Sequence, residues 1–175
     1  MDSNTWIKIT DIILYASIAL VGLFAILGLI QWISRKSIKK VDKQILWMIL
    51  PMALVAITYL ICDKILTPDR FSFMPTRPDG SGEPSFPSTH VMVVGTIFFC
   101  VSAALPKYIK SKTILVILDI LMFALASLTA TGRIMSEKHS YIDVAGAIVF
   151  AFIFYEIYYA VIHRKKTKKE EKEDE

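Results

Sequence analysis

Five stretches of the sequence are long, apolar and almost free of charge, and this pattern constrains the fold more than any other feature. They run from Asp11 to Ile33, Ile45 to Leu66, Val91 to Leu105, Thr113 to Ala130 and Ile142 to Ile162. A helix rises about 1.5 Å per residue, so a bilayer core roughly 30 Å thick is crossed by about 20 apolar residues. The third stretch is the shortest, but its helix reaches spanning length if it begins at Pro87 and continues past Pro106. We therefore predict an all-α, polytopic membrane helix bundle of about five transmembrane helices.

Composition agrees with this interpretation. The chain has 175 residues, of which 54% are hydrophobic, and a mean hydropathy of +0.51. A soluble domain would spread these residues amphipathically rather than in blocks. We expect one integral membrane domain over residues 1–163, with the polar motifs in 64–162, and a charged cytoplasmic tail over 164–175.

The basic residues predict the orientation of the bundle. Lysines and arginines fill the first loop, the third loop and the start of the tail, at Arg35, Lys36, Lys39, Lys40, Lys43, Lys107, Lys110, Lys112 and residues 163–169. Five alternating spans place these segments on one side, which the positive-inside rule makes cytoplasmic. The N-terminus is then outside and the C-terminus inside. The net charge of +4 is thereby explained without a nucleic-acid partner.

Most of the polar residues that could take part in catalysis or ligand binding lie in the two loops predicted on the outer side. The first loop, about 67–90, contains Arg70, the pair Arg77-Pro78 and the run Pro87-Ser88-Thr89-His90. The second loop, about 132–141, contains Arg133 and His139 and is followed by Asp143. Two spans separate the loops, so both return to the same membrane face. Topology alone therefore allows these groups to converge.

Each of these residue types suits phosphate chemistry. Arginines offer forked donors to phosphate oxygens, and a helix that starts after Pro87-Ser88 presents free backbone N–H groups to an anion. The spacing of His139 and Asp143 predicts a shared helical face, where the carboxylate accepts an imidazole N–H and orients a nucleophile. His90 is placed to give a proton to a departing alkoxide. We find no metal-site spacing and expect neither metal nor cofactor.

Together these residues resemble the signature of the type 2 phosphatidic acid phosphatase superfamily, which has three ordered parts: K-x6-R-P, P-S-x-H and S-R-x5-H-x3-D. The resemblance covers about residues 70–146 and includes the flanks Ser85-Phe86 and Val144-Ala145-Gly146. It implies that His139 is a nucleophile that carries a phosphohistidine, that Asp143 orients it and that His90 protonates the leaving lipid oxygen. It also implies that a phosphate-binding set holds the substrate, formed by Arg70, Arg77, Ser88, Thr89 and Arg133.

The chain departs from the signature at three positions. Arg70 stands in place of the usual Lys, Gly132 in place of the usual Ser, and Thr89 at the variable position that is often Gly. Many bacterial members also have six spans, whereas five are predicted here. None of these departures removes a group that the implied chemistry requires.

The resemblance implies a membrane phosphatase whose partner is a lipid phosphate in the bilayer, and it makes no prediction of oligomeric state. The small size and outward site suit a bacterial cell-membrane enzyme. Undecaprenyl pyrophosphate is the slightly favoured substrate, beside phosphatidylglycerophosphate and phosphatidate. The alternatives are a lipid phosphotransferase and a non-catalytic lipid-binding or transport protein of the same fold; intact His139 and Asp143 argue against the latter.

Two acidic residues stand within predicted spans, Asp119 in the fourth and Glu156 in the fifth. An unpaired charge there is costly and can mark an ion or substrate path. We favour a structural role, protonated or hydrogen-bonded across helices.

Overall fold

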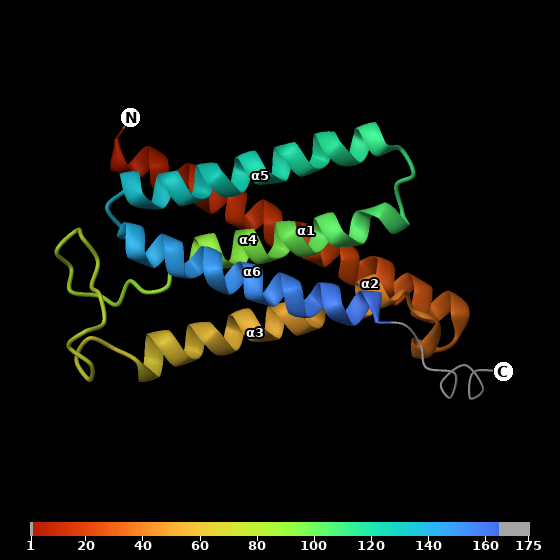
Figure 1. The fold of residues 1–175 in the computed structure, drawn as a ribbon, viewed down its shortest axis with the longest axis horizontal. Coiled ribbons are helices and arrows are strands. Elements are labelled where there is room, and N and C mark those ends of the chain that lie inside the picture. The colour runs from red at the N-terminus through yellow and green to blue at the C-terminus, as the bar shows by residue number, and fades with distance from the viewer. Residues whose placement is uncertain (1, 165–175) are drawn as a thin grey trace.

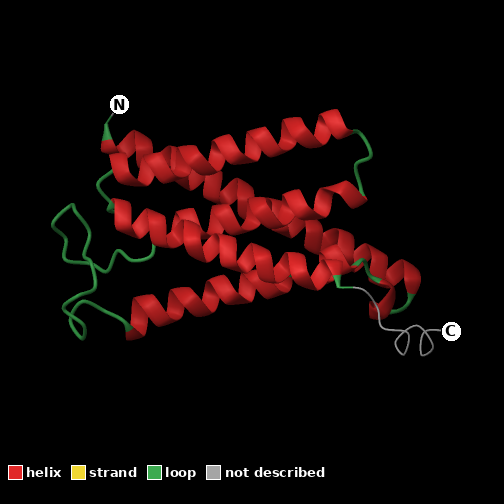
Figure 2. Ribbon diagram, viewed as in Figure 1, coloured by secondary structure: helices red, strands yellow, loops and turns green. Residues whose placement is uncertain are grey.

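The computed structural model describes residues 2–164 of the chain, which contain helices and loops and no β-strand (Figure 2). Five helical segments are long and apolar enough to cross a membrane, which confirms the predicted polytopic bundle. Only Arg164 of the predicted tail, 164–175, is described; the remainder of that prediction lies outside the described residues.

The five spans are built from eight of the nine helical elements. The first is α1 (Ser3–Arg35), and the second joins α2 (Lys43–Leu46), α3 (Ile49–Leu60) and the π-helical η2 (Ile61–Ile65). The third joins α4 (Thr89–Ala104) and the 3₁₀ turn η3 (Leu105–Lys107); the fourth is α5 (Lys112–Met135) and the fifth α6 (Tyr141–His163). A short 3₁₀ turn, η1 (Ile38–Lys40), lies between the first two. The third span thus continues past Pro106 as predicted, but it begins at Thr89 and not at Pro87, because Ser88 is the extended N-cap residue.

Helix α4 forms the centre of the bundle. It packs against α1, α3, α5 and α6, and Figure 1 shows it running between them. In its most apolar window 56% of residues are buried, against 11% in α5. A central helix needs small and medium side chains so that its neighbours can approach. Met92, Val94, Thr96 and Cys100 supply that surface and are fully buried.

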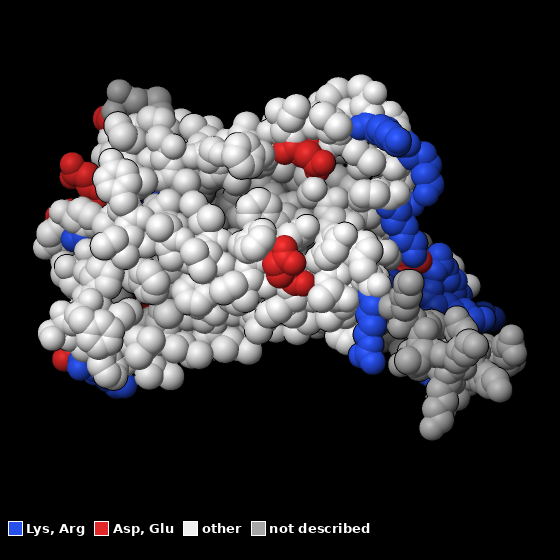
Figure 3. All heavy atoms as spheres, viewed as in Figure 1, with Lys and Arg blue, Asp and Glu red and all other residues white. Residues whose placement is uncertain are grey.

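One end of the bundle is strongly basic (Figure 3). There Asp42 pairs with Arg35 at 3.3 Å and with Lys107 at 2.8 Å, and it accepts a hydrogen bond from Gln31 at 2.9 Å. Burial alone raises the pKa of Asp42, but its bonds to Lys107, Gln31 and Arg35 outweigh that effect and lower the pKa to about 2. The ionised carboxylate thereby joins the first and third loops.

The opposite end carries the polar loops. Figure 1 shows the long loop before α4, the turn between α5 and α6 and the N-terminus at this same end. Lys138 of the turn binds Asp79 of the long loop at 2.8 Å. The two segments that hold the motif residues therefore converge, as the even number of intervening spans predicts.

Candidate active site

The long loop is folded by a short hairpin-like contact. Thr76 and Pro84 form an isolated bridge, the Arg77 amide donates to Glu83 at 3.0 Å, and the Ser85 amide donates to Pro75 at 3.2 Å. The Arg77 side chain also pairs with Glu83. These contacts bring Arg77 and Ser85 together at the base of the loop.

The helix starts of α4 and α6 are tied to each other. Ser88 precedes α4, and its amide donates to the Asp143 carbonyl at 3.1 Å. Ser140 caps α6 in a capping box with Asp143, whose Oδ2 accepts the Ser140 amide at 2.7 Å. Such reciprocal caps satisfy donors that a helix start leaves free. The second and third motifs therefore form one packed unit.

A cavity of about 410 Å³ opens beside this unit. Its polar lining contains five of the eight residues that the sequence singles out, namely Arg77, Thr89, His90, Arg133 and His139. Its apolar lining includes Leu14, Ile18, Tyr59, Met92 and Val93. Ser88 and Asp143 are fully buried behind it. One cavity thus joins cationic and aliphatic walls.

His139 is oriented differently from the expectation. Its Nδ1 donates to the Ser85 carbonyl at 2.9 Å, whereas Asp143 Oδ2 lies 3.9 Å away, beyond hydrogen-bond distance. The four-residue spacing predicts a shared helical face, but α6 begins only at Tyr141, so His139 precedes the helix. The carbonyl fixes the proton on Nδ1 and leaves the lone pair of Nε2 free.

The environment of His139 favours its neutral form. Burial, followed by the nearby Arg133 charge, lowers its pKa to about 4, although Asp143 acts in the opposite direction. A group with a lowered pKa is unprotonated at neutral pH, which is the state a nitrogen nucleophile needs.

We expect the His139 ring to stay neutral as the pH falls from about 7 to about 5, since an ordinary histidine protonates near 6.5. The chain has three histidines, so carbon-13-labelled imidazoles give a simple NMR spectrum, assigned with His139→Ala. Replacing Arg133 by Gln removes a repelling charge and should raise the midpoint. A His139 midpoint near 6.5 in the wild type would contradict this description.

His90 has a partner that the motifs do not contain. Its Nε2 lies 2.8 Å from Oδ1 of Asp11 on α1, and the same oxygen lies 3.9 Å from Arg133. In the sequence, Asp11 marks only the edge of the first apolar block. An ionisable residue at that edge is itself a signal of function.

Several buried polar atoms of the site have no partner within residues 2–164. The donors are Nε of Arg77, Nε of Arg133 and the hydroxyls of Ser85 and Ser88, and the one acceptor is Oδ1 of Asp143. The Arg133 side chain is only 8% exposed. Leaving buried donors unpaired costs about 1–3 kcal/mol each, more when charged. Guanidinium and hydroxyl donors of this kind match the oxygens of an oxyanion.

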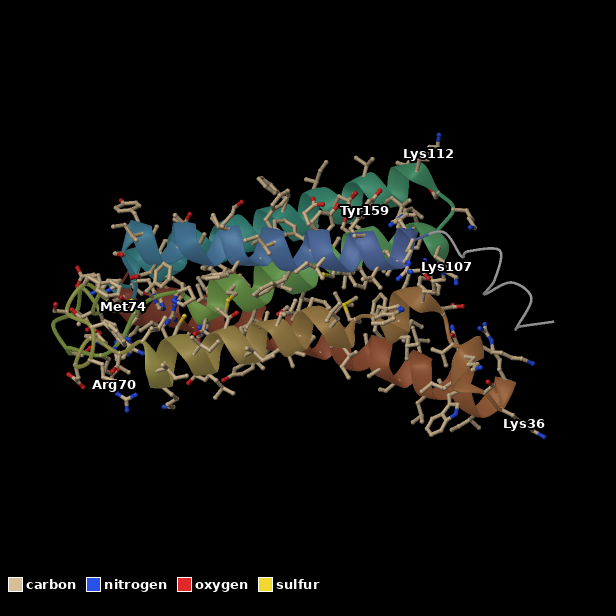
Figure 4. All side chains as sticks on the ribbon, turned by 60° about the horizontal axis from the view of Figure 1, so that its bottom comes forward. Lys36, Arg70, Met74, Lys107, Lys112 and Tyr159 are labelled. Atoms are coloured by element: carbon tan, nitrogen blue, oxygen red, sulfur yellow. The ribbon has the colours of Figure 1, made fainter. Side chains whose placement is uncertain are left out.

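Arg70 lies apart from this cluster. Arg70 is exposed and does not line the cavity, and Figure 4 shows its side chain pointing away from the loop. Its amide donates to Thr67 within a turn that follows η2. The implied phosphate contact of Arg70 stays a prediction, and this conformation does not make it.

The glycine at position 132 has a packing reason. A Cβ built there lies 2.6 Å from Thr10 Cγ2 and 3.1 Å from the Trp6 ring, so α1 packs directly on this point of α5. Arg133 follows it, and its Nη1 donates to the Thr10 hydroxyl at 3.5 Å. The Ser that is usual here would push α1 away.

Gly132→Ser is therefore expected to destabilise the protein by about 1–3 kcal/mol, the usual cost of overpacking. Activity should fall with it, because Thr10 and Asp11 move relative to Arg133. Thermal unfolding in detergent measures the first effect. Gly22→Ser is the matched control, because nothing lies within 4 Å of a Cβ there. Unchanged stability with raised activity would show instead that the missing hydroxyl matters.

The described residues, 2–164, contain no group of three or more His, Cys, Asp or Glu side chains placed to hold a metal ion. The cations that face the cavity are supplied by side chains, chiefly Arg77 and Arg133.

The fold and site define a multi-pass membrane helix bundle with a cavity lined by two arginines and two histidines. The sequence matches the PAP2 superfamily over residues 58–167, more than half of the chain, and the protein belongs to that family. Membership supports a phosphatase-type activity, the hydrolysis of a phosphoryl group. No curated protein and no solved structure gives a significant match.

Proposed function

We propose that this protein hydrolyses a lipid phosphate or pyrophosphate through a phosphohistidine on His139. The observation that carries the proposal is the set of buried, unpartnered donors beside the cavity, at Arg77, Arg133 and Ser88. A phosphoryl group bears charge on several oxygens at once, and forked guanidinium donors match that arrangement.

The histidines divide the chemistry between them. Nε2 of His139 forms a bond to phosphorus while the bond from phosphorus to the leaving lipid oxygen breaks, and His90 gives that oxygen a proton. Water then attacks the phosphohistidine and passes a proton to His90. The phosphorus–nitrogen bond breaks, and inorganic phosphate leaves. Arg77 and Arg133 stabilise the charge that builds up on the phosphoryl oxygens in both steps.

The apolar wall supports a lipid as the substrate. Leu14 and Ile18 on α1, with Tyr59 on α3, line the same cavity as the arginines. A phosphate bound at the polar end would leave its tail against these side chains, at the level of the spans. Among lipid phosphates we favour a polyprenyl pyrophosphate, with phosphatidylglycerophosphate and phosphatidate as the other candidates.

Phosphate release from these three lipids in detergent tests the proposal, with and without EDTA. We expect release from at least one lipid and no loss with EDTA, because protein cations do the work of a metal. Loss with EDTA would contradict the metal-independent mechanism. Appearance of phosphate on an added alcohol instead of in solution would identify a phosphotransferase. Binding without turnover of any of the three lipids would contradict hydrolysis.

The site is proposed to face the outside of the cell, since the basic loops lie at the opposite end (Figure 3). A membrane-impermeant maleimide should then label Ser81→Cys in intact cells. Ser81 is an exposed residue of the long loop. It is a better position for the cysteine than Gly80 or Gly82, because both glycines have positive φ angles. Ser37→Cys, in the basic loop, should react only after permeabilisation. The wild type, whose two cysteines are buried, is the blank. The reverse pattern would invert the orientation.

A further inference from the structure

The first helix contributes a carboxylate to the site. Asp11 Oδ1 lies 2.8 Å from Nε2 of His90, although the two residues are 79 positions apart. Asp11 also precedes the segment matched by the family, which begins at residue 58. The family match therefore does not include Asp11.

Several contacts hold Asp11 in this position. Thr10, its neighbour, is fully buried where α1 packs on Gly132, and it accepts a bond from Arg133. At the start of α1, about two turns before Asp11, the Ser3 hydroxyl donates to the Ser136 carbonyl at 3.0 Å. The part of α1 that precedes Asp11 is thus fixed against the end of α5. Asp11 is presented to His90 by packed backbone rather than by a mobile loop.

The contact decides how His90 is oriented. A carboxylate only accepts hydrogen bonds, so Nε2 of His90 carries a proton and donates to Asp11. The other ring nitrogen, Nδ1, is then left for a ligand in the cavity that His90 lines. Without Asp11 the ring has no partner to fix its rotation or its tautomer.

The contact also bears on the charge of His90. The charged groups around it are Asp11 on α1, Arg133 on α5, Arg77 in the long loop and, across the cavity, Asp63, which is paired with Lys64. Burial of the ring disfavours a positive imidazole, and both guanidinium groups act in the same direction. Asp11 is the carboxylate in direct contact with the ring, and it acts against these effects.

We propose that Asp11 is a positioning residue for His90, fixing the rotation and the tautomer of its ring so that Nδ1 faces the leaving oxygen. This inference rests on the proposed function for its catalytic meaning, but the coupling of the two side chains stands on the geometry alone. The proposal predicts that loss of Asp11 slows hydrolysis most when the leaving group needs a proton.

The first test is independent of activity. Imidazole NMR should follow His90 in the wild type and in Asp11→Asn, with His139 and His163 assigned by substitution. Loss of the carboxylate should lower the His90 titration midpoint. Asp119→Asn is the matched control. Asp119, on α5, accepts a hydrogen bond from the Ser102 hydroxyl on α4 and does not line the cavity that holds His90. An unchanged His90 midpoint in Asp11→Asn would overturn the proposal.

The second test compares leaving groups. Phosphatidate expels an alkoxide, which needs a proton, whereas a lipid pyrophosphate expels a phosphate ester of far lower basicity. Asp11→Asn should lose about tenfold to a hundredfold in kcat on phosphatidate, within the range of general acid catalysis, and much less on the pyrophosphate. Asp11→Glu should recover part of the loss.

A double substitution shows whether Asp11 acts through His90 or through Arg133. Asp11→Asn combined with His90→Gln should be no slower than His90→Gln alone, because the two act as one unit. Equal losses on both lipids, with additive effects, would show that Asp11 acts through Arg133 and would overturn the assignment to His90. If no lipid is hydrolysed but the His90 midpoint still shifts, the proposed function fails and the coupling of Asp11 to His90 holds.

Discussion

Replacing His139 by alanine is expected to reduce phosphate release by about 10⁴-fold or more, because the covalent pathway then has no nucleophile. The structure makes this residue a strong candidate, with its Nδ1 proton held by the Ser85 carbonyl and Nε2 left free. The same substitution should abolish transfer of radioactive phosphate from substrate to protein. Phosphate release in detergent and acid-labile labelling measure the two effects.

His163→Ala is the matched control for this experiment. His163 is exposed at the other end of α6, where its ring stacks on Tyr159 and bonds to that residue's carbonyl. Its loss should leave both phosphate release and labelling unchanged. If His139→Ala still accepts radioactive phosphate, another residue is the nucleophile and the proposed mechanism is wrong.

Arg133→Lys should lower kcat/KM by about 10²–10³-fold, although it keeps the positive charge. A guanidinium presents a planar fork to two phosphate oxygens, and a lysine ammonium does not. At this site the side chain is buried, and its Nε has no protein partner within the described residues. Steady-state kinetics on the preferred lipid measures the loss.

Arg35→Lys makes the same chemical change at the basic end, where Arg35 pairs with Asp42, and should cost little activity. The Arg133→Lys protein should also unfold at nearly the wild-type temperature in detergent. Wild-type kinetics in Arg133→Lys would show that only charge is needed at this position. A collapse in stability would instead assign Arg133 a structural role through Thr10.

Much of the fold follows from local sequence. The bilayer fixes the length of an apolar helix, so five blocks predict five spans without knowledge of their packing. The shortest block illustrates the limit, since its helix starts at Thr89 and gains its last turn only by continuing through Pro106. Orientation, inferred from the basic loops, stays a prediction.

The convergence of the site is also predictable, because two spans separate the loops that hold His90 and His139. What the sequence does not contain is the path of each loop. The spacing of His139 and Asp143 assumes a continuous helix, whereas the chain turns at Ser140 and the Ser85 carbonyl becomes the partner of His139. Arg70 matches the motif in order, but its turn leaves it outside the cavity.

Asp11 shows why long-range partners escape such reasoning. Nothing near residue 11 indicates a histidine 79 positions later, because the contact depends on the register of α1 against α5. That register depends on the absence of a side chain at Gly132. From the sequence alone, Gly132 is recognised only as a departure from the motif. The two observations become meaningful together in three dimensions.

The close approach of α1 to Gly132 also sets a rule for rebuilding the molecule. A first helix grafted from a six-span relative must bring a carboxylate to the level of His90 and tolerate contact at Thr10, or residue 132 must be changed with it. The first helix and the start of the third motif therefore have to be exchanged as a pair.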